Sequence, residues 1–273
     1  MALDGDLARV AAGGMVLLGC GKMGTALLTG WLAAGVPATS VWVIEPHPTD
    51  WLTGLGVHLN EGLPAAAAVA LVAVKPQMMK LALVSLRPLG NGGTLVVSIA
   101  AGTTIATFEA ALGANTPIVR TMPNTPAMVG RGITGICANA AGQVGLPLAR
   151  ALMRAVGEVV DLTGEDQIDA VTAVSGSGPA YVFHLIEALA AAGVAEGLST
   201  AVAMQLARAT VCGAGELAFR APETAEQLRI NVTSPGGTTA AALAHLMDPG
   251  TGLPPLMERA VHAAAERGRE LGR

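Results

Sequence analysis

The stretch MVLLGCGKMG at residues 15–24 decides the fold, because it joins a short apolar run to a glycine-rich turn. MVLL is typical of a buried β-strand, and GCGKMG matches the spacing G-x-G-x-x-G of dinucleotide-binding turns. In such a turn Gly19 makes the tight bend, Gly21 lets the backbone approach a pyrophosphate, and Gly24 brings helix and strand together. Because the match follows the first strand of an α/β pattern, we expect it to bind a nucleotide.

Short apolar runs alternate with helical stretches from Met15 onward. The runs are MVLLG, SVWVIE, VALVAV, TLVVSIA and TPIVRTM. This alternation is typical of a parallel sheet with helices on both faces. We therefore expect a doubly wound, Rossmann-like α/β domain over residues 15–163, preceded by a loose leader at residues 1–14.

The second half, residues 164–273, consists of long Ala- and Leu-rich segments without further strand signals. It predicts an all-α domain. Several segments are apolar nearly all the way round, which a domain of about 110 residues can bury only with help from a partner. A dense core is the simpler alternative, but the excess of apolar surface favours dimerisation.

Charge and cysteine content exclude several classes of protein. The net charge is −4, and neither half offers a basic face for nucleic acid. Cys20, Cys137 and Cys212 have neither metal-ligand spacing nor a disulfide pattern, which fits a reducing cytoplasm. The N-terminus does not resemble a secretory signal, and apolar runs such as 65–74 are too short to cross a bilayer. We expect a soluble, cytoplasmic protein without a metal.

Glu45 ends the strand that follows the glycine turn, 21 residues beyond Gly24. A carboxylate there can accept hydrogen bonds from a ribose diol, which favours NADH over NADPH. Two alternatives remain: Glu45 is a solvated acid in the loop EPHPTD, or a 2′-phosphate is met by His47 or a backbone turn. Lys22, within the turn, lies either near phosphate or in solvent.

Three later motifs follow strands and should border the same crevice, since ligands of α/β sheets bind at the carboxyl ends of strands. AVKPQ at 73–77 makes Lys75 a candidate contact, with a surface lysine as the alternative. SIAAG at 98–102 and RTMPNTPA at 120–127 offer small residues that would let a nicotinamide approach.

VTSPGGTT at 232–239 precedes an Ala-rich helical run. Ser234 is expected as the N-cap and Pro235 as the first helical residue, while the paired glycines leave backbone N–H groups uncovered. Such a terminus can receive an anion, and a plain helix start is the alternative.

The second half argues against hydroxyacid oxidation, which typically needs a lysine base there, because the last lysine is Lys80. His184, His245 and His262 lie in helical patterns and receive no role in the mechanism. Reduction of an imine remains, since a protonated C=N is already electrophilic and needs mainly orientation and anion binding.

GCGKMG, AVKPQ, SIAAG, RTMPNTPA, SGSGPAY and VTSPGGTT, in this order, resemble the pyrroline-5-carboxylate reductase family. The resemblance implies a Rossmann domain, a helical dimerisation domain and frequent assembly into decamers. It also implies reduction of pyrroline-5-carboxylate to L-proline with NADPH or NADH, in sites that need both chains of a dimer.

The resemblance also assigns residues. The implied cofactor contacts, with Glu45 added from its position, are Gly19, Cys20, Gly21, Lys22, Met23, Gly24, Asn60, Ala73, Val74, Lys75, Pro76, Ala100, Met122, Pro123 and Asn124. The substrate carboxylate is placed on the backbone of Ser234, Pro235, Gly236, Gly237 and Thr238. Thr239 is the implied catalytic residue, with its hydroxyl near the ring nitrogen, and Glu165 resembles a substrate-site acid. Lys22 stands where many relatives have Asn or a small polar residue, and its charge weakens the NADH prediction.

Two other functions stay open. A related imine reductase could act on a six-membered imino acid, which the same anion receptor would hold. A dimeric redox sensor would bind the cofactor without oxidising it.

Overall fold

The computed structural model describes residues 5–272, which fall into two compact units. The first unit runs through Gly176 and includes the chain end from Ala265, and the second is Ser177–Ala264. The compact α/β unit thus extends 13 residues past the boundary expected at residue 163, which stays a prediction. The helical pattern does begin there, but its first turns pack on the α/β unit and leave Ile168 only 1% exposed.

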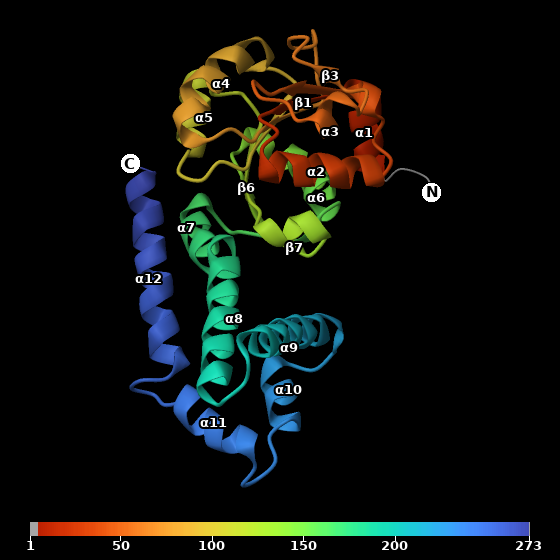
Figure 1. Cartoon of the computed structure of the whole chain (residues 1–273). Coiled ribbons are helices and arrows are strands. Elements are labelled where there is room, and N and C mark those ends of the chain that lie inside the picture. The colour runs from red at the N-terminus through yellow and green to blue at the C-terminus, as the bar shows by residue number, and fades with distance from the viewer. Residues whose placement is uncertain (1–4, 273) are drawn as a thin grey trace. The chain divides into compact units, whose positions relative to one another are not determined.

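An eight-stranded sheet forms the first unit (Figure 1). Its order is β3-β2-β1-β4-β5-β6-β7-β8. The strands are β1 (Met15–Leu18), β2 (Val41–Ile44), β3 (His58–Leu59), β4 (Val69–Val72), β5 (Leu95–Ser98), β6 (Ile118–Met122), β7 (Gly132–Ala138) and β8 (Gly157–Asp161). All five apolar runs are strands, as predicted, and the doubly wound fold is confirmed.

The sheet is not wholly parallel, which corrects the prediction. β7 pairs antiparallel with β6, whereas every other neighbouring pair is parallel. The sequence did not predict β3, β7 or β8. β3 has only two residues, β7 contains two glycines, and β8 is a largely exposed edge strand, so none forms a clear apolar run.

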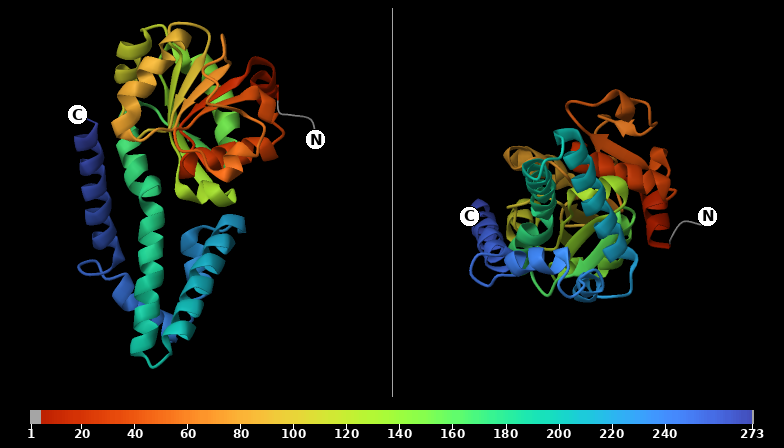
Figure 2. Two further views of the ribbon diagram at one scale, coloured as in Figure 1. Left: turned by 45° about the horizontal axis from the view of Figure 1, so that its top comes forward. Right: turned by 60° about the horizontal axis from the view of Figure 1, so that its bottom comes forward.

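Alternating side chains of β1 separate two hydrophobic cores, as the pleat of a strand requires. Met15 and Leu17 pack with the helices α1, α2 and α6, whereas Val16 and Leu18 pack with α4 and α5. The ribbon views of Figure 2 show helices on both faces of the sheet. The helices are α1 (Gly5–Gly13), α2 (Lys22–Ala33), α3 (Asp50–Thr53), α4 (Met79–Leu86), α5 (Ile105–Leu112), α6 (Leu146–Arg154) and α7 (Ile168–Val171). Trp31 on α2 is fully buried, and its indole N–H donates to the Leu152 carbonyl at 2.9 Å.

Residues 5–13 form α1, so the loose leader predicted for residues 1–14 is wrong over this range. Leu7 and Val10 lie three positions apart on one helical face and are buried in the core. Two apolar residues make too short a stripe to stand out in sequence. The leader prediction for residues 1–4 falls outside the described residues.

The second unit is helical, as predicted. It contains α8 (Gly178–Ala195), α9 (Thr200–Arg220), α10 (Ala225–Asn231), α11 (Thr238–Leu246) and the first part of α12 (Leu253–Leu271). Its one hydrophobic cluster among the described residues is small, with Ala190, Ala203 and Ala207 buried between α8 and α9. The alternative of a dense core within this unit is therefore wrong.

Large apolar side chains cover the outside of the helical unit. The exposed ones on α8 and α9 are Val182, Phe183, Leu185, Leu189, Val194, Val202, Leu206, Leu217 and Phe219. The helical stretch Glu165–Ala195 is long and apolar enough to cross a membrane, contrary to the expectation from the shorter apolar runs. Exposed apolar side chains in this number are also what a partner protein covers.

The burial of α1 leads to a test. Val10→Ala should lower the free energy of unfolding by about 2 kcal/mol, because it removes buried methyl groups. Ala12→Ser, on the exposed side of the same helix, is the control and should change little. Chemical denaturation measures both, and equal stabilities would contradict the packing of α1.

Candidate active site

The glycine turn at residues 19–24 has the geometry of a dinucleotide cradle. Gly19 has φ +85°, and a Cβ there would lie 2.7 Å from the Ala73 carbonyl oxygen. A Cβ on Gly24 would lie 2.6 Å from the Gly19 carbonyl oxygen. Neither position accepts a side chain, which explains the tight turn and the close contact between α2 and β1.

Gly21 is different, because a Cβ there would meet no atom of residues 5–272 within 4 Å. It is the N-cap of α2, and no described side chain caps this helix. The N–H groups of the first turn therefore have no capping side chain, and a pyrophosphate can accept their hydrogen bonds. The cradle fits a dinucleotide.

Glu45 directly follows β2, and its carboxylate binds the backbone of the glycine turn. Its Oε2 accepts a hydrogen bond from the backbone N–H of Cys20 at 2.7 Å, and its Oε1 accepts one from that of His47 at 3.0 Å. Glu45 is therefore a bridge to the glycine turn and not simply a solvated acid. Carboxylate oxygens have further lone pairs, so a ribose diol can still donate to it.

The Asn60 side chain forms hydrogen bonds with the backbone of Glu45 and so positions that residue. It adopts a left-handed conformation with φ +57°, which asparagine tolerates better than most residues. Its amide oxygen accepts from the Glu45 N–H at 2.9 Å, and its amide nitrogen donates to the Glu45 carbonyl at 3.0 Å. The nucleotide contact implied for Asn60 stays a prediction.

Cys20 contributes its backbone rather than a reactive thiol. Burial raises the pKa of this thiol above its ordinary value, partly offset by a hydrogen bond with Thr25. The side chain is 7% exposed. It therefore stays neutral and adds no negative charge beside the pyrophosphate site.

The other predicted cofactor residues follow β4, β5 and β6, whose carboxyl ends meet at one edge of the sheet. Lys75 is exposed, directly before a 3₁₀ turn that begins at Pro76. The Ala100 N–H donates to Ser98 Oγ at 3.2 Å. The buried Asn124 side chain accepts from the Ile133 N–H at 3.0 Å, which holds the turn after Met122.

Glu165 lies in the α/β unit and is paired. Its Oε1 accepts from Arg120 Nη1 at 2.6 Å and from the Ile105 N–H at 2.8 Å. Arg120 is a site residue that the sequence motifs do not single out, although an arginine inside the apolar strand TPIVRTM is a signal. The substrate role implied for Glu165 stays a prediction.

The SPGGTT segment departs from the predicted cap. α11 begins at Thr238 with Gly237 as its N-cap, so Ser234 and Pro235 form the preceding turn, not the helix start. The Gly237 N–H donates to the Ser234 carbonyl at 3.0 Å, and Gly236 has φ +70°. A left-handed glycine at residue 236 breaks the chain direction before the helix can begin.

The uncovered donors lie at the first turn of α11. The first helical hydrogen bond runs from Ala241 to Gly237, which leaves the N–H groups of residues 238–240 without a partner inside the helix. No described side chain caps this terminus. Thr239 is half-buried in the same turn.

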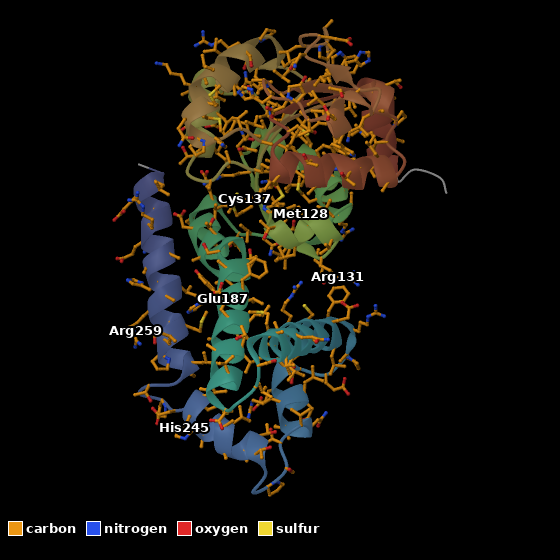
Figure 3. All side chains as sticks on the ribbon, in the orientation of Figure 1. Met128, Arg131, Cys137, Glu187, His245 and Arg259 are labelled. Carbon is orange, nitrogen blue, oxygen red and sulfur yellow. The ribbon has the colours of Figure 1, made fainter. Side chains whose placement is uncertain are left out.

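Charged residues of the helical unit are spread over several helices. Figure 3 shows Glu187 on α8, His245 on α11 and Arg259 on α12. Glu187 pairs with the exposed His184 at 3.1 Å. Within residues 5–272, no group of three His, Cys, Asp or Glu residues could hold a metal ion.

Two family models together match most of the chain. The model for pyrroline-5-carboxylate reductase dimerisation matches residues 165–271, and a model for coenzyme F420-dependent NADP oxidoreductases matches residues 15–102. A pyrroline-5-carboxylate reductase of Pseudomonas aeruginosa is 40% identical over 264 residues, which cover 94% of this chain and 96% of the relative. That of Synechocystis is 41% identical over 265 residues, covering 94% and 97%. The chain belongs to the pyrroline-5-carboxylate reductase family.

Solved structures of this family agree with the fold. A pyrroline-5-carboxylate reductase from Coxiella burnetii matches with a TM-score of 0.89 at 36% identity, covering 96% of this chain and 99% of that one. The Plasmodium falciparum enzyme, solved with NADP bound, matches with a TM-score of 0.81 at 29% identity, covering 96% and 98%. The predicted family, two-part fold and NAD(P)H-dependent oxidoreductase class are confirmed, and the dimerisation match confirms self-association.

The open space at Gly21 gives a sharp test of the cradle. Gly21→Ala should fold with an unchanged melting temperature but raise the Kd for the reduced dinucleotide at least about tenfold, because a methyl group intrudes where the pyrophosphate approaches. Gly93→Ala, also in open space and with ordinary φ, is the matched control. Fluorescence titration measures the Kd, and wild-type affinity in Gly21→Ala would contradict the assignment.

Proposed function

We propose that this chain reduces L-1-pyrroline-5-carboxylate to L-proline with NAD(P)H as hydride donor, the last step of proline biosynthesis. The observation that most supports this is the pair of uncovered helix N-termini. The one on α2 adjoins the dinucleotide cradle, and the one on α11 suits a carboxylate. Membership of the reductase family supports the same reaction.

The substrate carboxylate is held by the backbone from Ser234 to Thr238. The N–H groups at the start of α11 point out of the helix end, where the helix dipole also favours an anion. A Cβ on Gly236 would meet no atom of residues 5–272 within 4 Å, so the backbone there is not shielded by a side chain. This explains how the segment binds an acid without any charged residue of its own.

Thr239 acts at the ring nitrogen. When bound, the reduced nicotinamide supplies a hydride to C5 of the cyclic iminium. The Thr239 hydroxyl hydrogen-bonds the nitrogen and orients the ring, and it relays a proton if the imine arrives unprotonated. The small side chain of Ala100, after β5, lets the nicotinamide approach, and Met122 lies at the end of the neighbouring strand β6.

The proposed cofactor preference is for NADH, because Glu45 places a negative charge beside the glycine turn. A ribose diol can donate to this carboxylate, whereas a 2′-phosphate is repelled by it. Lys22 is exposed in the same turn and partly opposes the repulsion. The preference is therefore modest.

The chain is soluble, and its apolar helical surface is assigned to self-association. We propose a dimer as the basic unit, with decamers as a further assembly. We also propose a cytoplasmic location, since Cys20, Cys137 and Cys212 are all unpaired, as in most proteins of reducing compartments.

The test of the proposed chemistry is Thr239→Val, which keeps the volume and removes the hydroxyl. With pyrroline-5-carboxylate and NADH, kcat should fall about 100-fold, as expected for loss of the group that hydrogen-bonds the ring nitrogen and orients the ring. Absorbance of the reduced nicotinamide measures it. Thr210→Val, an exposed threonine within α9, is the control, and wild-type turnover in Thr239→Val would make the assignment wrong.

Cofactor choice is tested at Glu45. Glu45→Gln removes the charge but keeps an oxygen that can accept from Cys20, so the ratio of kcat/KM for NADH over NADPH should fall about tenfold. Glu158→Gln on the exposed edge strand β8 is the control. An unchanged ratio would show that the Glu45 charge does not set the preference.

The rival functions give different results in the same assays. A reductase of six-membered imino acids would turn over that ring faster than pyrroline-5-carboxylate. A redox sensor would bind the dinucleotide tightly, yet no imine would accelerate its oxidation.

A further inference from the structure

Arg120 is a charged residue that is buried within the β-sheet. It lies in the middle of β6, between Ser98 on β5 and Cys137 on β7, and its side chain is 6% exposed. Figure 3 labels Cys137, which burial and the nearby Glu165 carboxylate keep protonated by raising the thiol pKa to about 11. A guanidinium in this apolar sheet requires a partner, and Glu165 supplies it.

The ion pair of Arg120 and Glu165 is expected to add little to the stability of the fold. Arg120 Nε is buried and has no hydrogen-bond partner among residues 5–272. Arg120 is buried and the Glu165 side chain is 29% exposed, so the pair must overcome mainly the desolvation of the guanidinium, and apolar replacements of such pairs are often as stable. The role of Arg120 and Glu165 is therefore to fix the position of the backbone that they contact.

That backbone is the start of α5. The Glu165 oxygen that meets Arg120 also accepts the N–H of Ile105, the first residue of α5. Thr104 caps the same helix by accepting from the Thr107 N–H at 3.2 Å. A carboxylate at this positive helix end is electrostatically favourable, and it fixes where the segment 98–104 ends.

The segment 98–104 is held at other points as well. At its start, Ser98 Oγ accepts from the Ala100 N–H at 3.2 Å. In its middle, Gly102 has φ +76°, and a Cβ there would lie 3.0 Å from the Leu271 carbonyl oxygen of α12. The Glu165 contact completes the set, so this segment at the strand ends has a defined shape.

We propose that Arg120 and Glu165 are positioning residues that hold the segment 98–104, and with it Ala100, at the distance that hydride transfer requires. Arg120 orients the Glu165 carboxylate from within the sheet, and the carboxylate anchors Ile105. In this proposal neither side chain contacts the substrate, which is the alternative to the substrate role that the resemblance implies for Glu165. This inference rests on the proposed function, because it takes Ala100 as part of the nicotinamide site.

The experiment compares three variants. Glu165→Gln keeps an oxygen that can accept from both Ile105 and Arg120, so kcat should stay within about threefold of wild type. Glu165→Ala removes the anchor, so kcat should fall at least about tenfold with KM for the imino acid unchanged. The isotope effect with 4-deuterated reduced nicotinamide should rise, because the hydride step becomes slower.

The third variant, Arg120→Met combined with Glu165→Ala, separates positioning from folding. It leaves no unpaired buried charge, so its melting temperature should return toward wild type. The Ile105 N–H still lacks its acceptor, so kcat should remain as low as in Glu165→Ala. Recovery of kcat together with stability would overturn the proposal in favour of a purely structural pair.

A substrate contact predicts another pattern. If Glu165 binds the imino acid through its charge, Glu165→Gln and Glu165→Ala would raise KM alike, and this outcome overturns the proposal. The control is Asp161→Ala, which breaks the exposed pair of Asp161 with Arg150 in the same unit and should leave all parameters unchanged.

Hydrogen exchange tests the anchor without any turnover. Amides of residues 99–107 should exchange faster in Glu165→Ala than in wild type, and at the wild-type rate in Glu165→Gln. Equal exchange in Glu165→Ala would overturn the proposal. A failure of the proposed function is separate, since wild-type protein would then fail to oxidise either cofactor with pyrroline-5-carboxylate.

Discussion

The close approach of α2 to the end of β1 is the constraint on which the α/β unit depends. The Gly19 carbonyl and the Gly24 Cα leave no room for a Cβ, and Gly19 itself lies against Ala73 at the end of β4. A side chain at either glycine would push the helix off the sheet. Because no described side chain caps α2, the N–H groups of its first turn suit a phosphate.

Hydrogen bonds from residues distant in the sequence also hold the glycine turn in place. Glu45 bonds to the N–H of Cys20, and Asn60 holds the backbone of Glu45 on both sides. These contacts connect β2 and the residue after β3 to the glycine turn. Rigid placement of this kind is what a hydride transfer needs, since the protein supplies orientation and the cofactor supplies the chemistry.

The sequence predicted the features that lie within short contiguous stretches. Five strands, the glycine turn and the segment 232–239 each have a local pattern, and the family resemblance connected them. Patterns failed where the signal was weak, as in the two-residue β3 and the two-residue stripe of α1. The start of α11 was misplaced because serine and proline favour a cap, whereas the left-handed Gly236 delays the helix.

Contacts between distant residues could not be predicted in the same way. Arg120 and Glu165 are 45 positions apart, and Glu45 and Asn60 are 15 apart, so only the fold shows that they meet. The helical unit posed a different difficulty. Its apolar faces indicated a partner, and the structure shows that the unit by itself buries little more than alanines between α8 and α9.

The central claim is that this protein oxidises a reduced nicotinamide dinucleotide and, in the same reaction, reduces an imine. The most direct measurement is the stoichiometry of the wild-type reaction, with reduced nicotinamide followed by absorbance and L-proline by chiral chromatography. The account predicts one L-proline for each NADH or NADPH oxidised, with no oxidation when pyrroline-5-carboxylate is omitted. Folded protein that binds the cofactor and yields no proline would contradict it.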